Sequence, residues 1–79
     1  MKLTLRQEEV IKLMRKGWIG ENAICNNESA YLINEYGQRR KINLSNFSGL
    51  RKLGLVDCKK VNFALYQYLL TELGKTIEL

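Results

Sequence analysis

The sequence has no histidine among its 79 residues, only two cysteines and no long apolar run. Histidine is the commonest general base, completes the usual serine and cysteine triads and supplies ligands to most zinc sites. Its absence argues against hydrolytic catalysis, and the chain also lacks a glycine-rich phosphate-binding loop. Glu8 and Glu9 lie about 100° apart around a helix, so they form no facing carboxylate pair. We therefore expect neither an enzyme nor a bound metal or cofactor.

Cys25 and Cys58 are too few for the disulfide framework of a small secreted domain, and their separation of 33 positions matches no metal-ligand spacing. We expect two free thiols, with a single disulfide as the alternative. The longest apolar run, 63–70, contains Gln67 and is far shorter than the ~20 residues that span a bilayer. The N-terminal residues do not resemble a signal peptide. These features predict a cytoplasmic protein without a membrane span.

The composition is that of an ordinary globular domain, with 46% hydrophobic and 27% charged residues. A hydrophobic core begins to support itself at about 55–65 residues, so this length allows one core and no second. We expect a single domain over residues 1–79. Because small domains bury a modest share of their surface, a homodimer would gain stability, and the sequence leaves monomer and homodimer open.

Positive charge is concentrated in one stretch of the chain. Seven basic residues and one acidic residue lie between Arg39 and Lys60, an excess of six positive charges. The remaining six basic and seven acidic residues sum to −1, so the overall charge of +5 comes from this stretch. The clustering favours a basic face that binds nucleic acid over the alternative, a solvated lysine-rich surface.

Capping residues and apolar spacing predict three helices. Thr4 and Gln7 match a capping box for a first helix over about 5–16, which Gly17 ends. Thr71 is expected to cap a short closing helix.

The second helix starts at Asn43 or Ser45 and ends before Gly54. Its apolar side is expected to consist of Leu44, Phe47, Leu50 and Leu53. Gly49 costs about 0.8–1 kcal/mol in a helix interior, so we expect a close backbone approach there, to protein or to nucleic acid.

The segments between the helices lack a helical stripe and predict strands. Residues 30–34 and 38–42 form a hairpin around Gly37, and 23–25 adds a short third strand across a turn at 26–29. A second hairpin joins 55–59 to 63–70 through a turn at 60–62, which places lysines near its tip. Tyr31 and Tyr36 are candidate base-stacking residues, although packing explains them better.

Trp18 and Ile19 are expected in the core, and the largely buried residues are expected to include Leu13, Met14, Trp18, Phe47, Leu50, Leu53, Leu55, Leu69 and Leu70.

Two segments resemble the winged helix-turn-helix superfamily, in particular small proteins of this type from phages and mobile elements. They are SNFSGLRKLGLV at 45–56 and YLLTELGK at 68–75. The resemblance covers about 45 residues and implies an α+β, winged-helix-like fold: helix, β-hairpin, recognition helix, β-hairpin (the wing) and a short C-terminal helix. The sequence departs from the superfamily in one place, because a β-hairpin replaces the short positioning helix that normally precedes the recognition helix. Docking of the second helix into a major groove therefore does not follow directly from the resemblance.

These features together predict a small DNA-binding transcriptional regulator with double-stranded DNA as its partner. Phosphate contacts are expected from the first hairpin and the wing, through Arg39, Arg40, Lys41, Lys59 and Lys60. The second helix is expected to contribute contacts to base edges or backbone through Asn46, Ser48, Arg51 and Lys52.

Two other functions stay open from the sequence. The first is a protein–protein interaction module, such as a phage-type inhibitor or an accessory subunit, on a winged-helix scaffold. A histidine-free ribonuclease is the second, with Arg39, Arg40, Lys41 and Tyr36 as its candidates. A continuous basic face would favour nucleic acid, whereas a large apolar patch would favour a protein partner.

Overall fold

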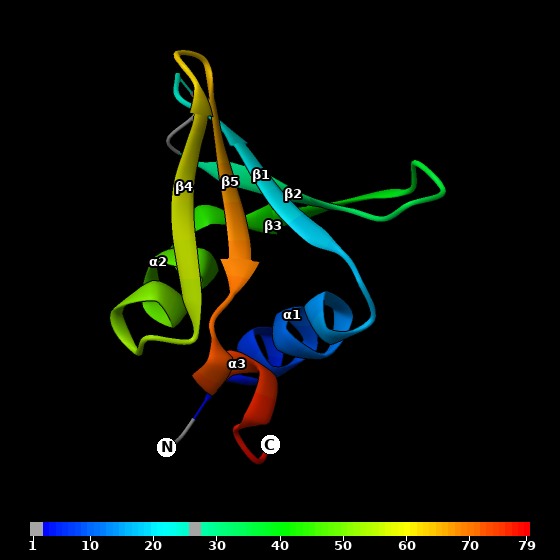
Figure 1. Ribbon diagram of the computed structural model, residues 1–79, viewed down its shortest axis with the longest axis vertical. Helices are drawn as coiled ribbons and strands as arrows, with labels where there is room; N and C mark the ends of the chain where they lie inside the picture. Colours follow the sequence, from blue (N-terminus) through cyan, green and yellow to red (C-terminus); the bar gives the residue numbers. More distant parts are fainter. Residues whose placement is uncertain (1–2, 26–27) are drawn as a thin grey trace.

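The computed structural model describes residues 3–25 and 28–79 as an α+β fold (Figure 1). Its elements follow one another in the order α1 (Leu5–Arg15), β1 (Ile19–Ala23), β2 (Ser29–Ile33), β3 (Arg39–Asn43), α2 (Leu44–Lys52), β4 (Val56–Asn62), β5 (Leu65–Leu70) and α3 (Glu72–Thr76). The predicted α+β class is confirmed. All three predicted helices are present, and each begins within a residue or two of its predicted start.

The strands form one antiparallel sheet in the order β3-β2-β1-β5-β4. Strand β1 lies at its centre, where Gly20 pairs with Leu32 on one side and with Tyr68 on the other. The order of the elements therefore differs from the predicted winged-helix layout, because β1 precedes the first hairpin and joins both hairpins into one sheet. A two-stranded hairpin is marginally stable in water, and β1 joins both hairpins by pairing its two edges. The sheet is strongly twisted, since the β4–β5 hairpin points to the top of Figure 1 and the β2–β3 hairpin to the right.

Strand β1 begins at Ile19, four residues before the predicted strand at 23–25. The prediction missed it because its buried positions carry Gly20 and Asn22, which do not produce an apolar alternation. Residues 26–27 of the turn predicted at 26–29 lie outside the described residues.

The tip of the second hairpin also differs from the prediction. Strand β4 continues to Asn62, so the turn lies at 63–64 and not at 60–62. The Asn62 side-chain oxygen accepts a hydrogen bond from the Ala64 N–H at 2.8 Å, a local bond that favours a turn at this position. Lys59 and Lys60 consequently lie within the strand, and Phe63, 88% exposed, lies at the tip.

The first helix begins with the predicted capping box. Gln7 N–H donates to Thr4 Oγ1 at 3.1 Å, and Thr4 N–H donates to Gln7 Oε1 at 3.0 Å. These bonds satisfy backbone donors that would otherwise lack a partner at the helix start. Gly17 adopts the expected left-handed conformation, with φ of 106°, and turns the chain into β1.

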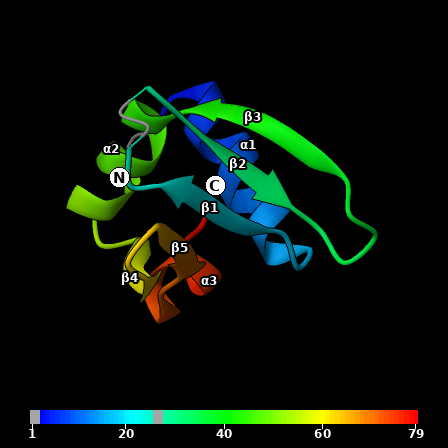
Figure 2. The same cartoon turned by 90° about the horizontal axis from the view of Figure 1, so that it is seen from above.

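The core lies between one face of the sheet and the helices α1 and α2 (Figure 2). At its centre the Phe47 ring stacks on the Tyr68 ring, with centroids 4.6 Å apart. Both side chains lie against Gly20, where an added Cβ would be 2.9 Å from each. The fully buried residues come from both layers and are Val10, Ile11, Leu32, Phe47, Leu50, Leu55 and Val56.

Burial of Phe47 and Leu50 confirms the predicted rotation of the second helix. Leu53, Leu69 and Ile19, by contrast, are exposed by 37%, 39% and 36%, so their predicted burial is wrong. Leu53 is the C-cap of α2 and lies beyond its last packed turn. In β1 and β5 successive side chains point to opposite faces, which places Ile19 and Leu69 on the face away from the helices. Leu13, Trp18 and Leu70 are half-buried against the core.

The short helix α3 is held by hydrogen bonds to neighbouring elements. The Thr71 hydroxyl accepts from the Gly74 N–H, as its predicted capping role requires, and donates to the Gly54 carbonyl. The Arg15 guanidinium donates to the carbonyls of Gly74 and Ile77, which ties α3 to α1. Within residues 3–25 and 28–79, every helix is too short or too polar to cross a bilayer.

Candidate nucleic-acid interface

The alternation of side chains along the strands divides the predicted basic residues between two faces of the sheet. In β4, Cys58 pairs with buried Tyr68, so Lys60 lies on the helix-covered face and Lys59 on the opposite face. In β3, Ile42 is buried, so Arg40 lies on the helix-covered face, with Arg39 and Lys41 on the opposite one. A single continuous surface made of all nine predicted residues is therefore not formed.

One group of predicted residues lies around α2 and the adjoining strand β4. Ser45, Ser48 and Lys52 follow the spacing i, i+3, i+7 and share the exposed side of α2, opposite buried Phe47 and Leu50. A surface hollow of about 380 Å³ is lined by Ser48, Arg51 and Lys52. We call the exposed side of α2, together with Lys60 on the helix-covered face of β4, the α2–β4 face. Its members are the predicted residues Ser48, Arg51, Lys52 and Lys60, and Ser45, which was predicted only as a helix cap.

The α2–β4 face carries three positive charges, and neither α2 nor β4 adds an acidic side chain to it. Helix α2 contains no acidic residue, and Asp57 of β4 alternates with Cys58 and so points to the opposite face. In the part of the chain that the structure describes, Arg51, Lys52 and Lys60 take part in no ion pair. Uncompensated cations on one surface create a positive potential that attracts polyanions.

Arg51 also lies close to the core residue Tyr68. Burial raises the pKa of the Tyr68 phenol above its ordinary value of 10.0, and the neighbouring Cys58 thiol raises it further. The positive charge of Arg51 acts in the opposite direction. The phenol is therefore neutral at physiological pH, and the charge of the α2–β4 face comes from its basic side chains alone.

Two of the nine predicted residues are placed less favourably for contact with a ligand. Arg40 lies 3.1 Å from Glu9 of α1, in an ion pair that joins the sheet edge to the helix. Glu9 compensates the positive charge of Arg40, so Arg40 is less suited to its predicted role as a phosphate contact. Asn46 is half-buried and lies about 160° around α2 from exposed Ser48, so it does not belong to the α2–β4 face.

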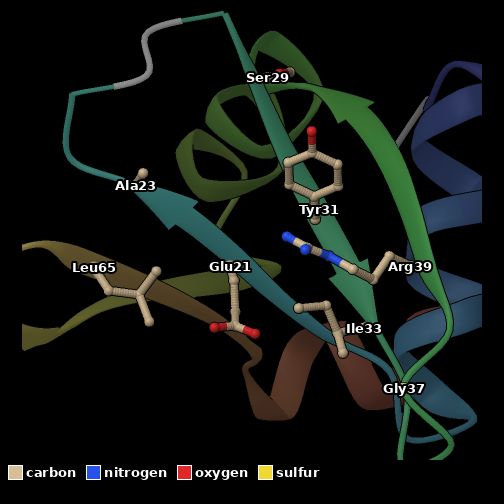
Figure 3. A pocket seen from close by; sticks show the side chains of 8 residues that line it. All are labelled: Glu21, Ala23, Ser29, Tyr31, Ile33, Gly37, Arg39 and Leu65. Atoms are coloured by element: carbon tan, nitrogen blue, oxygen red, sulfur yellow. The ribbon is translucent and has the colours of Figure 1, made fainter.

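The remaining cations, Arg39, Lys41 and Lys59, lie on the face of the sheet that the helices leave uncovered, which we call the open face. The pairing register aligns Lys59, Gln67, Glu21, Tyr31 and Lys41 in one row across all five strands. The Arg39 guanidinium lies over the Tyr31 ring, 4.5 Å from its centroid (Figure 3). Around this pair is a hollow of about 370 Å³.

Glu21 and Gln67, which lie in this row, were not among the predicted site residues. Glu21 belongs to the strand that was predicted too late, and Gln67 was counted only as an interruption of an apolar run. The pairing of β1 with both hairpins brings them together, and this pairing is non-local. Strict alternation of side chains along 65–70 would have placed Gln67 on the same face as Leu65 and Leu69, and this was the available signal for Gln67.

Comparison of the chain with protein-family models, curated proteins and solved structures found no match. The residues and their geometry are therefore the basis for any functional proposal.

Proposed function

We propose that this protein binds double-stranded DNA through the α2–β4 face and acts as a small DNA-binding regulator. The observation that carries the proposal is the set of three uncompensated cations, Arg51, Lys52 and Lys60, beside the exposed polar side of α2. Helix α2 has nine residues and a length of about 13 Å, and an α-helix fits the major groove of B-DNA. The β4–β5 hairpin adjoins α2, as a wing adjoins a recognition helix.

The whole order of the elements differs from the winged-helix layout, and the proposal uses only the part of it from α2 to β5. After α1, strand β1 pairs with β5, and the sequence α2, β4, β5 follows the recognition helix and wing of the resemblance. The β2–β3 hairpin occupies the place of the positioning helix. In this arrangement Ser45 and Ser48 would face base edges, and the three cations would contact phosphates.

Salt dependence of duplex binding tests the electrostatic part of the proposal. Three phosphate contacts give a log–log slope of about −3 on duplex DNA, because each contact releases condensed counterions. Replacing Lys52 and Lys60 together with alanine flattens the slope by about two and weakens all sequences alike. The matched control is Lys12→Gln with Lys75→Gln, which removes the same charge from exposed positions on α1 and α3. Fluorescence anisotropy with a mixed-sequence duplex measures both.

Equal slopes for the two double variants would contradict the assignment of the α2–β4 face. If the wild-type chain shows no retention on duplex DNA at ~50 mM salt, where such contacts are strong, the protein-partner alternative takes its place. The feature that favours that alternative is the apolar pair at the tip of the β4–β5 hairpin, Val61 and Phe63, which are exposed by 50% and 88%.

A further inference from the structure

We propose that the open face of the sheet is a second binding site, for single-stranded nucleic acid, with one base seated over Arg39. This site is independent of duplex binding, because it lies on the opposite side of the sheet from the α2–β4 face. Its residues come from all five strands, and the paired backbone of the sheet holds them in place.

The stacking surface consists of Tyr31 and Arg39. The Tyr31 side chain is half-buried and carries the Arg39 guanidinium on its ring, 4.5 Å from the centroid. This contact keeps the guanidinium next to the Tyr31 ring, and both side chains line the hollow (Figure 3). Unpaired bases stack on aromatic rings and on guanidinium planes alike. The apolar side chains of Ile33 and Leu65 line the same hollow and provide contact for the rest of the base.

The hydrogen-bonding group of the site is the Glu21 carboxylate, which lines the hollow together with Arg39. In the described part of the chain these two side chains form no ion pair, so the carboxylate can accept hydrogen bonds from a ligand. A carboxylate recognises the amino group of cytosine or guanine. Thymine and uracil present carbonyl oxygens on either side of a single N–H, and those oxygens repel it. The site therefore favours bases with an amino group.

The phosphates of the flanking nucleotides meet cations at both ends of the row. Lys41 on β3 and Lys59 on β4 terminate the row that passes through Tyr31 and Glu21. Four strand spacings separate these lysines by about 19 Å, a span suited to a short single strand of about four nucleotides. Within the row Glu21 is the one acidic residue, and Asp57 lies in the neighbouring row beside Leu69. The charge pattern thus fits a polyanion that crosses the strands and places one base at the centre.

Anisotropy measurements with single-stranded oligomers of about eight deoxycytidines or deoxythymidines at ~50 mM salt test this site on the full chain. The deoxycytidine oligomer is expected to bind about fivefold tighter, at the lower end of base discrimination by one hydrogen-bonding group. Arg39→Gln is expected to weaken both oligomers about tenfold through loss of stacking. Lys12→Gln removes the same charge from α1 and serves as the matched control. Glu21→Gln, which keeps the shape of the side chain, should bring the two affinities together.

Failure to bind either oligomer, or equal losses for Arg39→Gln and Lys12→Gln, would overturn the site. So would a dimer in sedimentation velocity that Arg39→Gln dissociates, because the open face would then be occupied by a second copy. Circular dichroism of Glu21→Gln and Arg39→Gln verifies that both fold. Duplex binding is measured in parallel. A protein that binds duplex DNA but neither oligomer would contradict the single-strand site and leave the proposed duplex function intact. A protein that binds the oligomers but not the duplex would contradict the proposed duplex function alone.

Discussion

Replacement of Gly20 with alanine is expected to destabilise the protein by about 1–2 kcal/mol. The new Cβ would lie 2.9 Å from Cε1 of Phe47 and 2.9 Å from Cβ of Tyr68. Neither atom can move away easily, because Phe47 is fully buried and Tyr68 is the direct cross-strand partner of Gly20. Overpacking of this kind costs about 1–3 kcal/mol, and the lower entropy of the unfolded alanine chain offsets about 0.4–1 kcal/mol of it.

The expected loss is a substantial part of the stability of a chain this size, for which about 4–12 kcal/mol is typical. The corresponding fall in Tm is about 5–15 °C, and thermal unfolding followed by circular dichroism measures it. Gly49→Ala is the matched control. Its Cβ would lie 2.6 Å from Nε2 of Gln7, whose amide must shift and weaken the capping-box bond from Thr4, and this cost offsets part of the gain of up to about 1 kcal/mol that alanine brings to a helix interior. An unchanged or raised Tm for Gly20→Ala would refute the packing of α2 against β1.

Two further predictions concern Tyr68 and Thr71. The folded-state pKa of Tyr68 lies above its unfolded value of 10.0, so its contribution to stability is complete below pH 10 and is lost as the pH rises through the folded-state pKa. Tyr68→Phe should therefore show a shallower alkaline loss of Tm than the wild type, and identical pH profiles would contradict the burial of this phenol. Thr71→Ala removes the cap of α3 and the bond to Gly54, at a cost of about 1–2 kcal/mol in urea unfolding, whereas replacement of exposed Thr76 should cost less. Equal costs for the two threonines would show that the cap does not stabilise α3.

Local signals predicted the helices well. The capping box at Thr4 and Gln7, and the positive-φ glycines at positions 17, 37 and 54, depend on residues close together in the chain. The rotation of α2 followed from the spacing of Phe47 and Leu50. Gly49 was expected to allow a close backbone approach, and within the protein its neighbour is instead the end of the Gln7 side chain.

The sheet could not be predicted in the same way, because β1 is defined by its partners. Its buried face carries Gly20, which admits the Phe47–Tyr68 stack, and Asn22, a polar residue. Neither gives an apolar signal, and only the pairing with β2 and β5 identifies the strand. The alternation of side chains along β3 and β4 separates Arg39 from Arg40 and Lys59 from Lys60, so residues adjacent in the sequence lie on opposite faces. The charge count identified the basic stretch but not this division.

Duplex DNA is proposed to contact the α2–β4 face, and the contact can be mapped residue by residue. Titration of the isotopically labelled full chain with a mixed-sequence duplex, followed by amide chemical shifts in two-dimensional NMR spectra, locates the contact directly. The proposal predicts the largest shifts in 45–52 of α2 and around Lys60 of β4, with the amides of α1 little changed. Shifts centred on Tyr31 and Arg39, or on α1, with α2 unaffected, would contradict it.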